Sequence, residues 1–330
     1  MAQAQATGPI VIGRTVAQAV ERVDVLERAR QQYQHTVQLE AQRASQIIRF
    51  DTDQPIGLAL MADLHFGGPG TDVDRIMSDA ALIAATDGLY CGFVGDMVDN
   101  FIVLKLAHAR RDNRLSIPDE WALFRLLLRT VGSKLLLMIG GNHDYWTKSI
   151  AGIDYLADIL ASINPAALYD EDDARVTVEV GGVQWPGRLR HKWRGSSIYN
   201  DTHGIERTQK WDQDFVWGVG AHTHVSGLVR QFNAAGADGL ALLCGAYKRV
   251  DVYARQVGFG KPNQSAAVMI LFDPASGTMQ GFNDLALSAR VLTALRAHGQ
   301  TTRQIDQRTS GQSGAAQQNR RAVRHRRAAA

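Results

Sequence analysis

The sequence predicts a layered α/β domain, and three observations carry that prediction. Several short, continuous apolar runs have the length of strands that are buried on both faces. Segments with helical apolar spacing lie between several of these runs. Clusters of Asp, Asn, His and Gly follow directly after four of the runs, where open α/β sheets place their functional sites. We therefore expect two packed sheets with helices outside them.

Length and composition fit a globular protein with a large core. The chain has 330 residues, of which 45% are hydrophobic and 21% are charged. No apolar run approaches the roughly 20 residues that span a bilayer, and the first residues do not resemble a signal peptide. Cys91 and Cys244 lie inside apolar runs, as small core residues of a reducing compartment do. We expect a cytoplasmic protein without a membrane segment.

Residues 1–50 are predicted to form an N-terminal helical arm. Within 15–48, apolar residues recur in steps of three and four along a polar segment, although Glu27 and Arg30 interrupt the stripe. The apolar positions are Val16, Val20, Val23, Tyr33, Val37, Ala44 and Ile48. Such a helix would either dock on its own domain or pair with a second copy in a homo-oligomer, and the pattern leaves both open.

Residues 51–288 are predicted to form the main domain. The pair Gly181-Gly182, flanked by alternating residues, is typical of a hairpin turn. The apolar runs that predict buried strands are 56–62, 88–94, 134–139, 215–219, 240–244 and 266–272, and the helical patterns are 72–86, 119–131 and 150–163.

Residues 289–330 are predicted to form a basic, disordered tail, with one short helix over 287–297. Their composition of Gln, Arg, Ser, Thr, Gly and Ala is typical of disorder. From Arg296 to the end there are eight arginines and one aspartate, a net charge of +7, so the rest of the chain carries −4. The tail is either a solubilising end or an element that neutralises the phosphates of a nucleic acid.

Five short segments hold the residues that can do chemistry. They are Asp63-Leu64-His65, Gly95-Asp96-Met97-Val98-Asp99, Gly141-Asn142-His143-Asp144, the lone His191, and Gly220-Ala221-His222-Thr223-His224. Two carboxylates, a carboxamide and four imidazoles drawn from them would make a ligand set for two adjacent divalent cations. Such a pair binds a phosphate ester and generates the hydroxide that attacks it.

The spacing within these segments suits metal binding. Asp63 and His65 are two residues apart at a strand end, so both side chains point to one face. His222 and His224 repeat this spacing. The segment that begins at Gly141 is the most specific, because a chance match in a chain of this length is on the order of one in a thousand.

The order of the five segments resembles the calcineurin-like metallophosphoesterase superfamily over residues 56–272. The resemblance implies a metallophosphoesterase-type four-layer α/β sandwich, in which two packed sheets are flanked by helices. It implies that His143 lies over the phosphate as general acid or charge stabiliser, and that Asp99 hydrogen-bonds His143 and keeps it protonated. The implied metal ligands are Asp63, His65 and His224 for the first cation, Asn142, His191 and His222 for the second, and Asp96 bridging both.

Elementary chemistry agrees with these roles. Two cations about 4 Å apart lower the pKa of a bridging water from 15.7 towards about 7. Mixed nitrogen and oxygen ligands suit Mn²⁺, with Fe, Zn²⁺ or Ni²⁺ as alternatives, better than Ca²⁺. A carboxylate beside His143 would raise its pKa and favour the cationic form.

His191 has a rival as metal ligand. It lies in a basic run from Arg188 to Arg194, which would equally suit a solvated surface, and His203 competes for the same role. We favour His191 because an apolar strand over 183–185 leads up to it. Trp193 would be available to stack on a base. The residues expected to face the substrate are then Arg190, Lys192, Asn200, His203 and Lys248.

The sequence differs from the superfamily pattern at a position that bears on the choice of substrate. Its protein phosphatases carry Arg-Gly after the last Asp of the second motif, whereas Asn100-Phe101 follows Asp99 here, which argues against a protein phosphatase. The segment from His191 to His203, together with Tyr247-Lys248, resembles phosphoesterases common in phage and prophage gene sets. A nucleic-acid or nucleotide substrate is inferred from that association alone. We expect a phosphodiesterase or nuclease acting on DNA, RNA or nucleotides. The alternatives are a small-molecule phosphomonoesterase, a cyclic-nucleotide phosphodiesterase and a non-catalytic metal-binding scaffold.

Overall fold

The computed structural model describes residues 16–42, 45–103, 113–195, 197–234, 237–249 and 266–299, and the chain divides into two units at Ser45. The first unit contains helix α1 (Val16–Gln42). Strand β1 (Gln46–Phe50) already belongs to the second unit, where it pairs in parallel with β6 (Ala174–Val180). The predicted helix over 15–48 is therefore too long at its C-terminal end. Tyr33 and Val37 of α1 are exposed, and pairing with a second copy stays a prediction.

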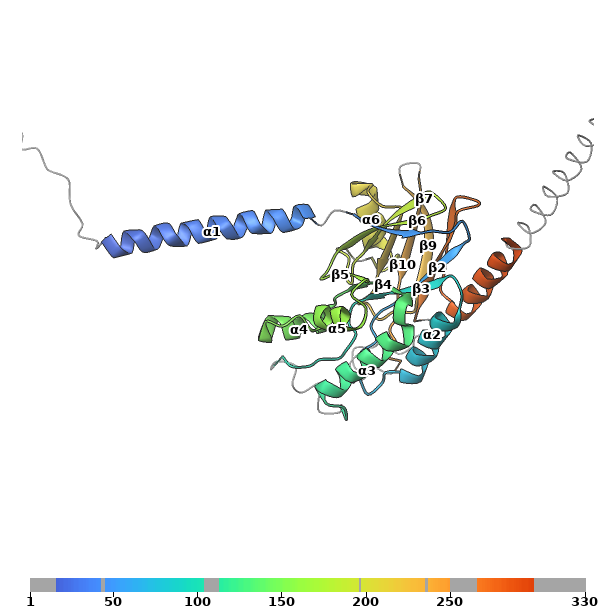
Figure 1. Ribbon diagram of the computed structural model, residues 1–330, viewed down its shortest axis with the longest axis horizontal. Coiled ribbons are helices and arrows are strands. Elements are labelled where there is room, and N and C mark those ends of the chain that lie inside the picture. The colour runs from blue at the N-terminus through green and yellow to red at the C-terminus, as the bar shows by residue number, and fades with distance from the viewer. Residues whose placement is uncertain are drawn as a thin grey trace, which may run out of the picture. The chain divides into compact units, whose positions relative to one another are not determined.

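The second unit is built on two mixed six-stranded sheets (Figure 1). The first sheet has the order β1-β6-β7-β8-β10-β9, with β7 (Val183–Leu189), β8 (Trp217–Gly220), β9 (Leu228–Ala234) and β10 (Ala237–Leu243). The second has the order β12-β11-β2-β3-β4-β5, with β2 (Ile56–Met61), β3 (Leu89–Val94), β4 (Leu135–Ile139), β5 (Leu168–Asp170), β11 (Val268–Asp273) and β12 (Thr278–Phe282).

The two sheets pack face to face, and strand β2 shows why its sequence is continuously apolar. Leu58 and Leu60 point into the core between the sheets, whereas Ala59 and Met61 point into the core beneath the helices. Because both faces of the strand are buried, the polar alternation of a surface strand is absent. The prediction of doubly buried strands is confirmed.

Helices cover the outer faces of both sheets and complete four layers. The core between the second sheet and its helices includes Phe124 of α3 and Leu292 of the helix at 285–299. On the first sheet, Ile205 of α6 packs against Phe215 and Trp193. The predicted α/β sandwich is confirmed. The helices are α2 (Val73–Ala85), α3 (Ile117–Val131), α4 (Asn142–Ala151), α5 (Tyr155–Ile163), α6 (His203–Asp212) and 285–299.

Two further predicted helices differ in extent from the structure. The helical pattern over 150–163 is two helices, because Gly152 ends α4 in the left-handed region (φ 70°) and Asp154 caps α5 through the N–H of Ala157. The short helix predicted over 287–297 runs from 285 to 299 and packs into the core, while the tail boundary at 289 stays a prediction. Arg296 of this helix pairs with Asp87 at 2.7 Å. Residues 300–330, where the remaining tail is predicted, lie outside the described residues.

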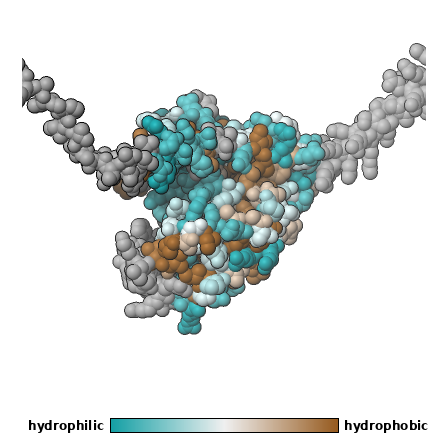
Figure 2. Space-filling view, turned by 60° about the vertical axis from the view of Figure 1, so that its left-hand side comes forward, coloured by the Kyte–Doolittle hydropathy of each residue, from teal (hydrophilic) through white to brown (hydrophobic). Residues whose placement is uncertain are grey.

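On the face shown in Figure 2, hydrophilic and hydrophobic residues are mixed, and the hydrophobic ones gather in a few patches. Cys91 and Cys244 are free and buried, as expected of core residues. Among the described helices, none is both long and apolar enough to cross a membrane.

A Cβ at Gly187 would lie 1.9 Å from Cε2 of the fully buried Trp217 on the neighbouring strand. We predict that Gly187→Ala lowers the free energy of unfolding by about 1–3 kcal/mol, measured by urea denaturation. Trp217→Leu removes the ring atoms that the new Cβ would meet and serves as the matched control. In that background Gly187→Ala should cost clearly less, and an equal cost in both backgrounds would contradict the assignment.

Candidate metal centre

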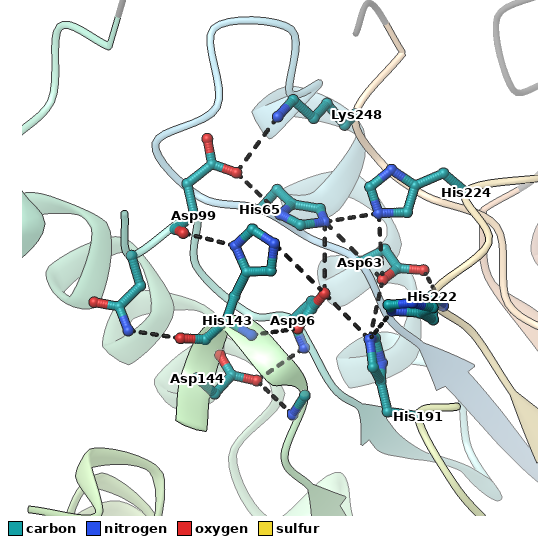
Figure 3. Close-up of polar contacts among 12 residues, drawn as sticks. Asp63, His65, Asp96, Asp99, His143, Asp144, His191, His222, His224 and Lys248 are labelled. Atoms are coloured by element: carbon teal, nitrogen blue, oxygen red, sulfur yellow. Dashed lines mark hydrogen bonds and ion pairs between the residues drawn. The ribbon is translucent and has the colours of Figure 1, made fainter. Parts of the chain in front are cut away.

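The five motifs meet at the carboxyl ends of strands from both sheets. Strands β2, β3 and β4 are parallel neighbours in the second sheet, and β7 and β8 are parallel neighbours in the first. Each is followed within three residues by one of the predicted ligands. Figure 3 shows the imidazoles of His65, His191 and His224 directed towards the carboxylates of Asp63 and Asp96.

The backbone of these loops is strained where the ligands sit. Seven non-glycine residues in the described parts of the chain have φ in the left-handed region, and five of them are predicted metal ligands. These are Asp63 (48°), His65 (47°), Asp96 (55°), His222 (75°) and His224 (52°). Asp and His tolerate this region better than most residues, but each such residue still costs on the order of 1–3 kcal/mol. Strain of this kind is typical of a functional site.

One group of ligand atoms gathers around Asp63. Its Oδ1 lies 3.7 Å from Nε2 of His224 and 4.0 Å from Nε2 of His65, and those two nitrogens lie 2.9 Å apart. The other oxygen of Asp63 accepts a hydrogen bond from the backbone N–H of His222. Oδ1 is buried and has no hydrogen-bond partner among the described residues. A buried carboxylate oxygen between two imidazole nitrogens is the environment that a cation would satisfy.

A second group gathers around Asp96. Its Oδ2 lies 3.1 Å from Nε2 of His191, and that nitrogen lies 3.3 Å from Nδ1 of His222. His191 donates its other ring N–H to the carbonyl of Val94, which leaves Nε2 to face the carboxylates. The same Oδ2 lies 4.0 Å from His65, so Asp96 belongs to both groups. The described residues thus form two neighbouring groups that share Asp96, and each group could hold a metal ion.

The charges in this centre depend on one another. Burial would raise the pKa of Asp96, but His191, His143 and His65 outweigh it and hold that pKa well below its usual range. Burial lowers the pKa of His191, but Asp96 and Asp63 outweigh it and raise that pKa to about 10. The cluster therefore favours ionised carboxylates beside positive charge, which is also the preference of a metal site.

Two predicted ligands need separate mention. His191 lies in the group around Asp96, whereas His203 is the first residue of α6 and belongs to neither of the two ligand groups formed by the described residues. Asn142 is the first residue of α4 and its side chain is exposed. Its backbone position follows Gly141, where a Cβ would lie 2.2 Å from Oδ1 of Asp96. Only a glycine at 141 lets this loop approach the shared carboxylate.

The arrangement around His143 differs from the expectation. The Asp99 carboxylate does not meet His143, because its Oδ1 lies 2.9 Å from Nδ1 of His65 and 3.5 Å from Nζ of Lys248. His143 instead donates Nδ1–H to the backbone carbonyl of Asp99. Burial and the neighbouring His65 lower the pKa of His143 to about 4, against the opposing effects of Asp96 and of the backbone carbonyl and charge of Asp99. Asp99 therefore acts on His143 in the expected direction, but burial and His65 outweigh it, and the catalytic roles of both residues stay predictions.

Asp144 has a role that was not predicted for it. Its two carboxylate oxygens accept hydrogen bonds from the backbone N–H groups of Asp96, Met97 and Gly141, at 2.8–3.0 Å. It therefore fastens the loop that carries Asp96 to the start of α4. Burial and the nearby Asp96 raise the pKa of Asp144 to about 7. The sequence feature that could have pointed to this role is the position of Asp144 as the last residue of the most specific motif.

The residues predicted to face the substrate are divided by the structure. Lys248 lies beside Asp99 at the centre. Lys192 is exposed, and its charge helps to lower the pKa of His222, although burial and the charge of His191 lower that pKa more. Arg190, in contrast, pairs with Asp173. Asn200 bonds Thr202 and Glu206 at the start of α6.

Trp193 is not a stacking surface. It is buried against α6 and donates its indole N–H to the carbonyl of Val219. The expectation that it could stack on a base is therefore wrong, because both its ring and its polar atom serve the fold.

Comparisons with known proteins add little to this geometry. No family model and no curated protein matches the chain. Similar solved structures include Haemophilus influenzae NAD nucleotidase (8% identity, 69% of this chain and 49% of that chain, TM-score 0.38), calcineurin-like phosphoesterase YfkN from Bacillus subtilis (9%, 71% and 91%, 0.36) and 5'-nucleotidase from Candida albicans (11%, 75% and 55%, 0.37). The chain spans about half the length of the NAD nucleotidase. At such identities a likeness concerns the fold and not the activity.

The ligand groups predict a stabilisation by metal. Mn²⁺ at about 100 times its Kd should raise the Tm of EDTA-treated protein by roughly 5–10 °C, because it binds the folded state only. His191→Ala should abolish most of this shift, and His203→Ala, the matched control, should keep it. The assignment fails if His191→Ala keeps the full shift or His203→Ala loses it, as read by differential scanning calorimetry.

Proposed function

We propose that the chain is a phosphoester hydrolase of the calcineurin-like metallophosphoesterase superfamily that uses two divalent cations. The observation that carries this proposal is the pair of buried ligand groups that share Asp96. Mn²⁺ is the first candidate for both positions, with Fe, Zn²⁺ or Ni²⁺ as alternatives, because the donors are imidazole nitrogens and carboxylate oxygens. Bound there, the cations would polarise a phosphate ester and acidify a water molecule between them.

The protein's own part begins with holding the shared carboxylate still. Oδ1 of Asp96 accepts the backbone N–H of His143 at 2.9 Å, and the backbone N–H of Asp96 is held by Asp144. These bonds leave Oδ2 directed at His65 and His191. A carboxylate fixed in this way keeps the two ligand groups at a constant separation without reorganisation.

His143 is placed to act on the substrate. Its Nδ1–H is committed to the carbonyl of Asp99, so Nε2, 4.0 Å from Oδ2 of Asp96, faces the centre. With a pKa of about 4 in this environment, the ring is neutral at pH 7. An anionic phosphate beside Nε2 would raise that pKa and favour the proton that the leaving oxygen requires. His143 therefore gains its acid function when the substrate binds.

We further propose nucleic acid or nucleotides as the substrate class. Lys248 and Lys192 supply positive charge at the centre, and the segment from Arg296 to the end carries +7. Arg190 contributes less than expected because Asp173 holds it. The alternatives are a phosphomonoesterase, a cyclic-nucleotide phosphodiesterase and a non-catalytic scaffold.

Replacement of His143 tests the mechanism. His143→Ala should lower the rate of hydrolysis of dithymidine monophosphate with Mn²⁺ about 10²–10⁴-fold, because the alkoxide that leaves needs a proton from the general acid. It should lower the rate for bis-p-nitrophenyl phosphate much less, because p-nitrophenolate leaves without a proton. The variant's bound Mn²⁺, measured by elemental analysis, should match the wild-type protein, and His35→Ala, at an exposed position of α1, should retain the wild-type rate. Loss of metal from His143→Ala would contradict its role. No turnover of either diester or of p-nitrophenyl phosphate by metal-loaded wild type would favour the scaffold.

Truncation tests the contribution of the tail. Arg296 supports the fold through Asp87, so the cut should follow residue 300. Deletion of residues 301–330 should weaken DNA binding at low salt and reduce its salt dependence, because six to seven phosphate contacts become unavailable. Hydrolysis of bis-p-nitrophenyl phosphate should be unchanged. Equal DNA affinity and salt slope in both proteins, by fluorescence anisotropy, would remove the tail from the proposal.

A further inference from the structure

Two aromatic rings, those of Phe101 and Trp146, lie against the His143 ring. The indole of Trp146, one helical turn along α4, lies 4.2 Å from the His143 ring at an interplanar angle of 34°. The Phe101 ring lies 5.2 Å from His143 and 5.6 Å from Trp146. Both residues are half-buried. We call Phe101 and Trp146 the aromatic pair.

The position of Phe101 is set by a buried polar network. Asn100, directly before it, has φ 46° in the left-handed region and is fully buried. Its backbone N–H donates to Glu120 of α3 at 2.8 Å, and its side-chain amide donates to the backbone carbonyl of His143 at 2.7 Å. A strained residue held by buried partners from α3 and α4 fixes the loop beside the acid. The network explains why Phe101 lies against α4.

A cation completes the surroundings of the aromatic pair. Nζ of Lys248 lies 6.0 Å from the centre of the Phe101 ring and 3.5 Å from Oδ1 of Asp99. The ammonium group therefore lies near both the Phe101 ring and the carboxylate that holds His65. Flat apolar faces next to a positive charge and a phosphate-binding centre match a nucleotide, which joins a planar base to a phosphate.

We propose that Phe101 and Trp146 form a stacking subsite for the base of the nucleoside that leaves when a phosphodiester is cleaved. This inference rests on the proposed function. A general acid must lie beside the oxygen that leaves, so the group attached to that oxygen extends from His143 and reaches the aromatic pair. The subsite thus selects nucleic acids and dinucleotides over esters with small aliphatic leaving groups.

The test compares dithymidine monophosphate with two analogues, each of which lacks one of the two bases, in the presence of Mn²⁺. The products identify which nucleoside leaves. Wild-type protein should hydrolyse the intact dinucleotide at least about tenfold better, in kcat/KM, than the analogue without the leaving base, because base stacking on an aromatic ring is lost. Trp146→Leu should reduce this ratio to about one, and Trp146→Phe should retain most of it.

The control is Tyr145→Leu, which alters the exposed aromatic residue directly before Trp146. It should leave the ratio unchanged. If Trp146→Leu lowers turnover of both substrates equally, Trp146 only positions His143 and the subsite is overturned. The subsite is also overturned if the wild-type ratio of the two kcat/KM values is near one, or if Trp146→Leu leaves that ratio unchanged. The proposed hydrolase function would survive both results. Absence of any turnover by wild-type protein overturns the proposed function with it. Should Trp146→Leu fail to fold, Phe101→Leu carries the same comparison.

Discussion

The structure depends on the meeting of two sheets at one pair of carboxylates. Asp63 and Asp96 follow neighbouring strands of the second sheet, and the first sheet reaches them through His191 and through the backbone N–H of His222. The face-to-face packing of the sheets sets where these strand ends come together. Apolar packing between the sheets, at residues such as Leu58 and Trp217, therefore determines the geometry of the polar centre.

Bringing these side chains together costs folding free energy, and the unfavourable contributions lie in a small region of the structure. Five predicted ligands adopt left-handed φ values, and Oδ1 of Asp63 is buried and has no hydrogen-bond partner within the described parts of the chain. Each feature disfavours the folded state by itself. The fold supports them through bonds that have no direct part in chemistry, above all the three backbone N–H groups held by Asp144. A bound cation would offset the remaining cost, because it satisfies the carboxylates that the fold brings together.

Sequence patterns predicted the parts of this molecule whose cause is local. The continuous apolar runs correspond to β2, β3, β4 and β11, because a strand buried on both faces needs apolar residues at every position. Strand β1 was missed, since its Ile48 also fits a helical stripe and only pairing with β6 makes it a strand. Strand β5 is half-buried and three residues long, too short to show a period.

The sequence by itself determined which residue types follow which strands, and hence the ligands and the reaction that they suggest. Tertiary structure decided how the side chains are paired. Asp99 turns to His65 and Lys248 instead of His143, Arg190 is taken by Asp173, and Trp193 is buried under α6. Spacing along a strand end limits the face on which a side chain lies, but its partner can come from any element packed nearby. That choice depends on the packing of both sheets, which no local pattern records.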